Sequence, residues 1–333
     1  MNLFLKDQRH DKNLLINTIF ILLLLTAVGF IIFMNYRVED EEMTTITEGN
    51  LDLRTWDWQQ QETVNLKGEW EFYWHQLLTP QDFAAPPLPK KDFFFEVPGE
   101  IDDYQVNEQN IEGRGYFTYR TQIRLPSDMK EDLALQLPRT VGTAFKVWIN
   151  GELAASEGEL GRTKREMQPG WGPKLIDFKL EEPKVEIIIQ ASNYYYHTSG
   201  LTGDLLLGPE EKIRDKKENG IAFDMLLFGS LLIMAFYHFG LFIFRPSDTS
   251  PLYFSLFCLI INLRMAVVGE AYLVGFFNLP YSVIYRMLLS YYLAVPVFCS
   301  FIASLYPKEF AKKVLTASQI LGVSFYTFVL ILP

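Results

Sequence analysis

The chain has 333 residues, enough for two domains, and its average composition combines two unlike parts. Residues 36–219 carry 21 Lys and Arg against 34 Asp and Glu, whereas most of the remainder is apolar. An acidic block of this kind argues against nucleic acid and against anionic lipid as its partner. Both cysteines, Cys258 and Cys299, lie in apolar segments, so the acidic block folds without disulfides.

The first apolar stretch predicts a membrane anchor. Residues 14–34 contain no charge, whereas a cleaved signal peptide has a shorter apolar region and a small-residue cleavage site. We therefore favour an uncleaved transmembrane signal anchor over 14–35, with residues 1–13 in the cytoplasm and 36–49 as a linker. Cleavage of this stretch is the alternative.

Residues 50–208 have the pattern of an all-β domain, because short candidate strands lie between Pro and Gly residues. Asn150-Gly151 is the strongest hairpin signal in the chain. The alternation of apolar and polar residues that marks a half-buried strand recurs over 115–125, 143–150 and 184–192. Many short antiparallel strands predict a β-sandwich or jelly roll.

Four apolar segments follow, each long enough to cross a bilayer core about 30 Å thick. We expect helices at about 220–245, 251–276, 281–306 and 313–333, the third with a kink at Pro296. The charged stretch 209–219 joins them to the β domain. Lysines in the loop 307–313 favour a cytoplasmic position for that loop, which places residues 36–219 outside the cell in a multi-pass protein of the cell membrane.

Several motifs carry a resemblance to known families. The β domain resembles the galactose-binding-like, jelly-roll sugar-binding domain of family 2 glycosidases in Val97-Pro98-Gly99, GYFTYR at 115–120, FKVWING at 145–151 and Ala191-Ser192-Asn193. Placed before a multi-span region, this pattern is similar to the bacterial seven-transmembrane receptors with diverse intracellular signalling modules (7TMR-DISM). GEWEFYW at 68–74, the stretch 200–208 and YHFGLF at 237–242 strengthen that similarity.

The resemblance implies a jelly-roll ectodomain followed by an α-helical transmembrane bundle. Such receptors carry seven spans and then a kinase, cyclase or phosphatase module, so the full-length protein would be a sensor histidine kinase or a diguanylate cyclase. With four spans here, we expect the chain to be the front part of a longer protein. We find no catalytic motif within it, and the acid pairs Glu157/Glu159 and Asp102/Asp103 are a weak signal for glycoside hydrolysis.

Candidate ligand-binding residues lie on one strand and in the loops of the β domain. Trp148 can stack on a sugar ring and Asn150 can bond hydroxyls, although Trp148 can equally cover a sheet and Asn150 can simply make the turn. The remaining candidates offer rings and donors suited to a polyol or saccharide, the alternative being an aromatic loop that packs on the domain or on lipid headgroups. They are Arg114, Arg139, Trp171, Tyr194, Tyr195, Tyr196 and His197.

Charged residues inside a membrane are costly and are usually paired or functional. We expect Asp224, Glu270 and Arg286 to meet as one outer-leaflet cluster. Arg264 lies deeper and needs His238, tyrosines, backbone carbonyls or a partner on further helices of the longer protein. The alternative to a signalling role is a polar clamp that fixes helix packing. His197 has no second metal ligand at suitable spacing, so we expect neither a metal nor a cofactor.

The first hypothesis is therefore a receptor whose sandwich senses a small, carbohydrate-like ligand and shifts the bundle between two packings, as a monomer or a homodimer. A transporter component with a β-domain vestibule is a second hypothesis. A membrane-anchored carbohydrate-binding or envelope module without signalling is a third.

Overall fold

The computed structural model describes residues 44–106, 109–111, 113–129, 131–138, 141–171, 174–196, 199–268, 272–277 and 279–331. The predicted anchor over 14–35 lies outside these residues, as do Arg139, His197 and Glu270. The chain divides into two units at Thr44, and the description below concerns the second, Thr45–Pro333.

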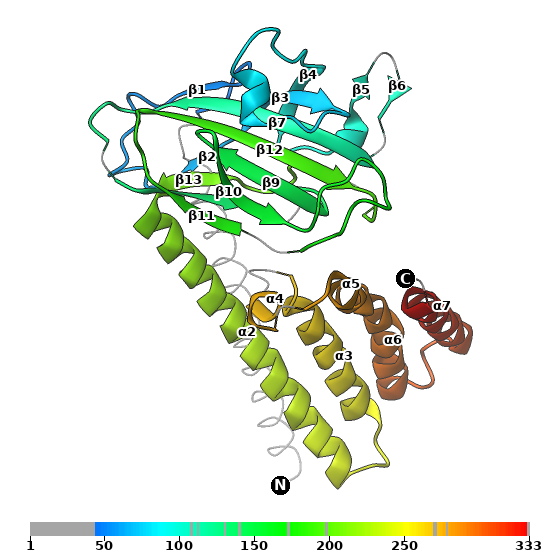
Figure 1. The fold of residues 1–333 in the computed structure, drawn as a ribbon. Coiled ribbons are helices and arrows are strands. Elements are labelled where there is room, and N and C mark those ends of the chain that lie inside the picture. The colour runs from blue at the N-terminus through cyan, green and yellow to red at the C-terminus, as the bar shows by residue number, and fades with distance from the viewer. Residues whose placement is uncertain are drawn as a thin grey trace. The chain divides into compact units, whose positions relative to one another are not determined.

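Two β-sheets form the first part of this unit (Figure 1). The larger sheet has the order β10-β9-β12-β7-β3-β4, with β1 parallel to β7, and the smaller has the order β11-β8-β13-β2. The strands of the larger sheet are β1 (Asn50–Asp52), β3 (Gly68–Trp74), β4 (Phe93–Val97), β7 (Gly115–Arg124), β9 (Ala144–Ile149), β10 (Glu152–Glu157) and β12 (Lys184–Asn193). Those of the smaller are β2 (Val64–Asn65), β8 (Leu133–Leu137), β11 (Lys174–Phe178) and β13 (Leu206–Pro209). A short pair, β5 (Gln105–Val106) and β6 (Gln109–Asn110), and the 3-10 turns η1 (Pro80–Phe83) and η2 (Ile101–Asp103) complete it.

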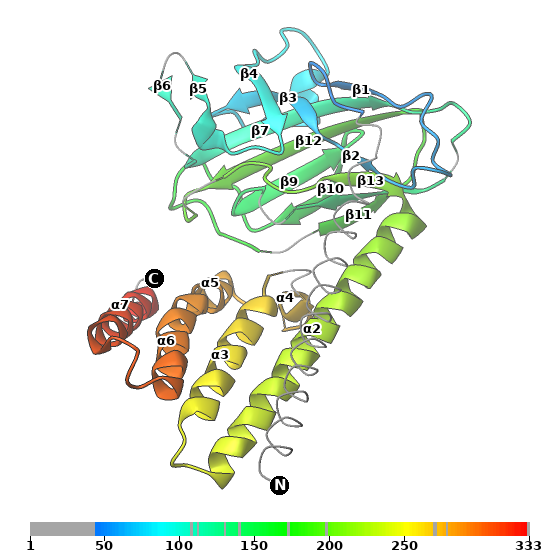
Figure 2. The same cartoon turned by 180° about the vertical axis from the view of Figure 1, so that it is seen from behind.

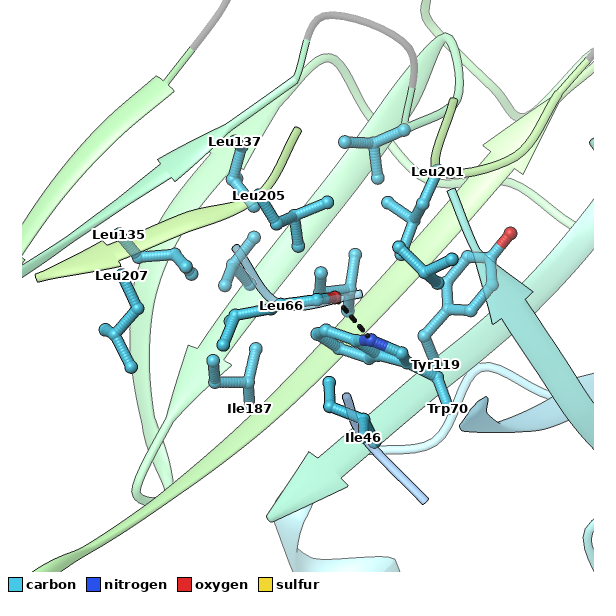
Figure 3. Close-up of a cluster of buried hydrophobic side chains, with 14 of the residues drawn as sticks. Ile46, Leu66, Trp70, Tyr119, Leu135, Leu137, Ile187, Leu201, Leu205 and Leu207 are labelled. Carbon is cyan, nitrogen blue, oxygen red and sulfur yellow. Dashed lines mark hydrogen bonds between the residues drawn. The ribbon is translucent and has the colours of Figure 1, made fainter. Parts of the chain in front are cut away.

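Alternate residues of the long strands face a core between the two sheets, as the sequence pattern predicts. Phe117, Tyr119 and Val147 are each 0% exposed, and burying a large apolar side chain contributes about 1.5–3 kcal/mol. Trp70 lies at the centre, where its indole N–H donates to the carbonyl oxygen of Leu66 at 3.1 Å (Figure 3). The sandwich prediction is therefore confirmed.

Part of the outer face of the larger sheet is also covered, which the alternation does not predict. The segment 76–83 crosses it, and Phe83 lies edge-on to Tyr73 with ring centroids 5.4 Å apart. Thr118 is 0% exposed, and its hydroxyl donates to the carbonyl of Gln76 in this segment. Arg120 stacks on Phe83 with its guanidinium carbon 4.5 Å from the ring centre.

The helices begin directly at the end of the sandwich. Strand β13 runs into α2 (Glu210–Phe244) without an intervening loop (Figure 2). The stretch 209–219, predicted as a separate joint before a helix at 220–245, is therefore mostly the start of that helix. The sequence favours a helix in this stretch, because Glu210 and Arg214 form an i,i+4 ion pair with nitrogen and oxygen 2.8 Å apart.

The remaining helices are α3 (Ser250–Met265), α4 (Tyr272–Phe277), α5 (Tyr281–Leu289), α6 (Ala294–Leu305) and α7 (Lys312–Ile331), with the 3-10 turn η3 (Ser290–Leu293) between α5 and α6. The single helix expected over 251–276 is thus wrong, because α3 ends at Met265. The sequence Val267-Val268-Gly269 that follows combines two β-branched residues with a glycine, all poor helix formers. The turn η3 matches the kink expected at Pro296, which cannot donate a helical hydrogen bond.

Three helical segments of the described chain are long and apolar enough to span a membrane: Glu210–Phe244, Tyr281–Leu305 and Lys312–Ile331. The apolar helix α3 is shorter. Large apolar side chains on α2 and α7 are exposed, including Ile233 at 72% and Leu321 at 70%. Such surfaces are stable in hydrocarbon and costly in water, which agrees with membrane insertion of this part.

Candidate functional site

The loop after β12 is shaped by one buried amide. Asn193 is 0% exposed, and its Nδ2 donates to the carbonyl oxygens of Gly113 at 2.7 Å and Tyr196 at 2.9 Å. Its Oδ1 accepts from the backbone N–H of Tyr196 at 3.0 Å and from the hydroxyl of Thr143 at 3.1 Å. These bonds hold residues 194–196 as a tight turn, so the three tyrosines of the predicted site diverge.

Each tyrosine of this turn has a different environment. The hydroxyl of Tyr194 donates to the carbonyl of Arg162 at 2.5 Å. Tyr195 is 36% exposed, and Lys164 places its Nζ 4.8 Å from the centre of that ring. Tyr196 packs against Trp171 with centroids 6.5 Å apart, and burial raises the pKa of its hydroxyl. Tyr194 and Tyr196 are held by contacts within the protein, and of the three tyrosines only Tyr195 is exposed.

Two of the predicted ligand residues contact a helix. The ring centroid of Tyr281, at the start of α5, lies 6.3 Å from those of Tyr195 and Trp171. We call Trp171, Tyr195, Tyr196 and Tyr281 the aromatic clasp. It joins the turn after β12 to the helical part of the chain, at a point separate in sequence from the β13–α2 connection.

Trp148 and Asn150 lie away from this turn. Trp148 is paired with Ile188 on β12, five residues before Asn193 and therefore about 16 Å along the strand. Its indole N–H donates to the side chain of Gln190 at 3.4 Å. Asn150 adopts φ +48° in the two-residue turn, and its side chain bonds the backbone of β12 at Glu186 and Lys184. The structure therefore does not gather these two residues with the tyrosine turn.

A further ring cluster lies at the same end of the sandwich as the tyrosine turn. His75 stacks between Trp74 and Tyr116, with centroid separations of 4.6 Å and 5.0 Å. Tyr116 pairs with Ser192, next to the turn, and the exposed Arg114 lies two residues before it. Sequence reasoning missed this stack, although Trp74-His75 at the end of the GEWEFYW motif was a usable signal.

The polar residues of the helical part are only partly placed together. The guanidinium carbon of Arg264 lies 4.9 Å from the ring centre of Tyr291, which supplies the tyrosine partner that the sequence predicts. The ring of His238 instead bonds the carbonyl of Met234 on its own helix at 2.9 Å. Asp224 on α2 and Arg286 on α5 are half-buried. Because Glu270 is not among the described residues, the three-residue cluster stays a prediction.

Arg264 and Asn262 retain unsatisfied groups. The Nε of Arg264 and both amide atoms of Asn262 are buried without a hydrogen-bond partner among the described residues. No group of three His, Cys, Asp or Glu side chains within the described ranges is placed to hold a metal ion. The helical part therefore contains buried polar groups, and the end of the sandwich near the tyrosine turn is lined by aromatic rings.

No curated protein matches the chain. Similar solved structures include β-glucuronidases from Faecalibacterium prausnitzii, Ruminococcus gnavus and an uncultured Clostridium species. Their identities are 16%, 16% and 15%, and their TM-scores are 0.34, 0.32 and 0.34. Each match covers 44% of this chain but only 31%, 27% and 29% of the respective enzyme. A likeness of this strength carries no information about function.

The membrane region gives a family match. Residues 221–333, from within α2 onward, match the family model described as 7TM diverse intracellular signalling. The sandwich before this region and the long apolar helices within it agree with that match. The membrane region of the chain, residues 221–333, is therefore similar to that of the seven-transmembrane receptors with diverse intracellular signalling modules.

Proposed function

We propose that the chain is the sensory input part of a membrane receptor, in which the sandwich binds an extracytoplasmic ligand and α2 carries the resulting movement into the bilayer. The observation that supports this most directly is the continuous passage from β13 to α2. The backbone N–H of Glu210 donates to the carbonyl of Asp132 in the sandwich at 3.0 Å. The helix thus starts on the sandwich itself, and the two move together.

Side chains of the first helical turns strengthen this joint. Ile213 is 0% exposed and packs with Ala134, Leu206 and Leu175 of the smaller sheet. Arg214 bridges to Asp177 of β11 at 2.7 Å. The ion pair is exposed and contributes little, so the apolar contact and the backbone bond dominate the stiffness of the joint.

The aromatic clasp gives the proposed receptor a second connection. A sandwich held only at β13 can tilt relative to the helices, whereas a sandwich also held at Tyr281 cannot tilt without separating these rings. Clasped and released arrangements are therefore two discrete states. A ligand shifts their populations only if it binds one of them more tightly.

The ligand class that the sandwich end favours is a saccharide or polyol. Rings such as Trp74, Tyr116 and Tyr195 can pack on the apolar faces of a sugar, while Arg114 donates to hydroxyls. We propose the extracytoplasmic side for the sandwich because the lysines near residue 310 favour the cytoplasm, which also places the N-terminus inside. A C-terminal kinase, cyclase or phosphatase module would then be the output, in a monomer or a homodimer.

The test uses the full chain in lipid nanodiscs. A panel of neutral saccharides and polyols is screened for an increase in the unfolding temperature, since a ligand that binds only the folded state stabilises it. For each hit, hydrogen exchange is measured over 194–196 and 208–214. We expect changes in both segments, because the clasp and the joint are coupled. A hit that changes exchange only around Tyr116 would identify a binding module without transmission.

A further inference from the structure

An open groove of about 780 Å³ lies where the sandwich meets the first turn of α2. One wall is formed by Trp58 and by Glu131 and Asp132, which precede β8. The other wall is formed by Pro209 and by Glu210, Glu211, Lys212 and Arg214 at the start of the helix. Its volume lies within the range of about 300–1,000 Å³ typical of small-molecule sites. The groove is separate from the ring cluster at the tyrosine turn.

The charges of the groove are unbalanced. Both cationic side chains that line the groove already form ion pairs. Lys212 pairs with Glu62 at 2.6 Å, and Arg214 pairs with Asp177 and Glu210. Among the described residues, no ion pair involves the lining carboxylates of Glu131, Asp132 and Glu211. The groove therefore presents net negative charge to any molecule that enters it.

An aromatic ring lines the same space. Trp58 is half-buried, and its indole Nε1 is buried without a hydrogen-bond partner in the described part of the chain. An indole ring beside unpaired carboxylates is the environment that attracts organic cations, by cation–π contact and by charge. A metal ion fits poorly, because no group of three suitable ligands is found among the described residues.

We propose that this groove is a binding site for a small organic cation that carries primary amines, such as a polyamine. The ammonium groups lie against Glu131, Asp132 and Glu211, and the methylene chain lies along Trp58. A ligand held in this way contacts the sandwich and the first turn of α2 together. It therefore stiffens or shifts the joint directly, without passing through the sandwich end.

The experiment measures spermidine binding to the full chain in nanodiscs of zwitterionic lipid by calorimetry. We expect saturable binding that weakens as salt is raised, because the carboxylates are exposed to solvent. The double variant Glu131→Gln/Glu211→Gln should weaken binding by about tenfold, because two of the three unpaired carboxylates of the groove lose their charge. Backbone amides of residues 210–214 should exchange more slowly when spermidine is bound.

The matched control removes the same charge elsewhere. Asp102 and Asp103 are exposed and are not among the residues that line the groove. Asp102→Asn/Asp103→Asn should leave binding unchanged. Equal weakening by the two double variants would mean general attraction to an acidic surface and would overturn the proposal, as would an absence of saturable binding.

Two more measurements separate this site from the proposed saccharide site. Sorbitol, a neutral polyol, should not compete with spermidine, and competition would contradict the assignment of the groove to cations. Trp58→Leu should also weaken the binding of spermidine, and its unfolding temperature is checked to be unchanged. Because the readout is binding, the groove can be confirmed even if no saccharide is found, and the reverse also holds.

Discussion

Replacing Ile213 by alanine should undock α2 from the sandwich while leaving both parts folded. The side chain of Ile213 is 0% exposed within a small cluster that includes Ala134 and Leu206. Truncating a buried isoleucine costs about 2–5 kcal/mol, and a small cluster that can relax places the loss near ~2 kcal/mol. That energy corresponds to about a thirtyfold increase in the population of the undocked joint.

The measurement is hydrogen exchange of the full chain in nanodiscs, followed over residues 208–214. Exchange in this segment should accelerate by about the same thirtyfold factor if opening is local. Ile233→Ala is the matched control, because Ile233 lies on the same helix but is 72% exposed. Equal exchange in the two variants would refute the docked joint. A loss of protection throughout the core around Trp70 would show that Ile213 supports the whole sandwich instead.

Three further predictions concern packing, charge and pH. Gly322→Ala should destabilise the contact between α7 and α6, because a Cβ there would lie 2.6 Å from the Pro296 ring. Gly240→Ala should be tolerated, because a Cβ at that position would have no heavy atom within 4 Å. The two variants are compared by thermal unfolding in nanodiscs. Arg120→Met should lower the free energy of unfolding by about 2 kcal/mol, because Glu71 and Glu186 lose their half-buried partner. Arg124 is exposed, so Arg124→Met should change the free energy of unfolding by under about 0.5 kcal/mol. The hydrogen bonds from Arg54 lower the pKa of Asp52 to about 2, so its stabilising contribution is complete above the ordinary value of 3.8 and is lost as pH falls through about 2. Asp52→Asn should therefore differ from the wild type in unfolding temperature at neutral pH and converge with it in strong acid.

Strand faces could be predicted from the sequence because burial on a sheet repeats every second residue. Phe117 and Tyr119 needed only that rule, and the Asn150-Gly151 turn needed only its backbone preference. Thr118 and Gln190 could not be placed, because their burial depends on the segment 76–83, which crosses the sheet from elsewhere in the chain. The alternation of apolar and polar residues along a strand predicts that one face of the sheet is covered, whereas part of the second face of this sheet is covered as well.

The candidate site shows the same division between local and distant information. The aromatic content of the turn at 194–196 marked it as a contact surface, but the sequence could not decide between a ligand, the domain and lipid headgroups as its partner. The structure supplies one partner, Tyr281, which is more than eighty residues away in the chain. Similarly, Trp74 and Tyr116 are ordinary strand residues until the stack on His75 brings them together.

The helical character of the joint has a mechanical consequence. With a rise of about 1.5 Å per residue, the 35 residues of α2 extend about 52 Å from Pro209, more than the thickness of a bilayer core. A flexible linker between sandwich and span would absorb a small displacement, whereas a helix that starts on the sandwich transmits it along its length. Tilting the sandwich about this fixed point moves the aromatic clasp, so the clasp and the joint cannot respond independently. Release of Tyr281 and movement of α2 should therefore occur as one event, and a ligand that alters either one alters both.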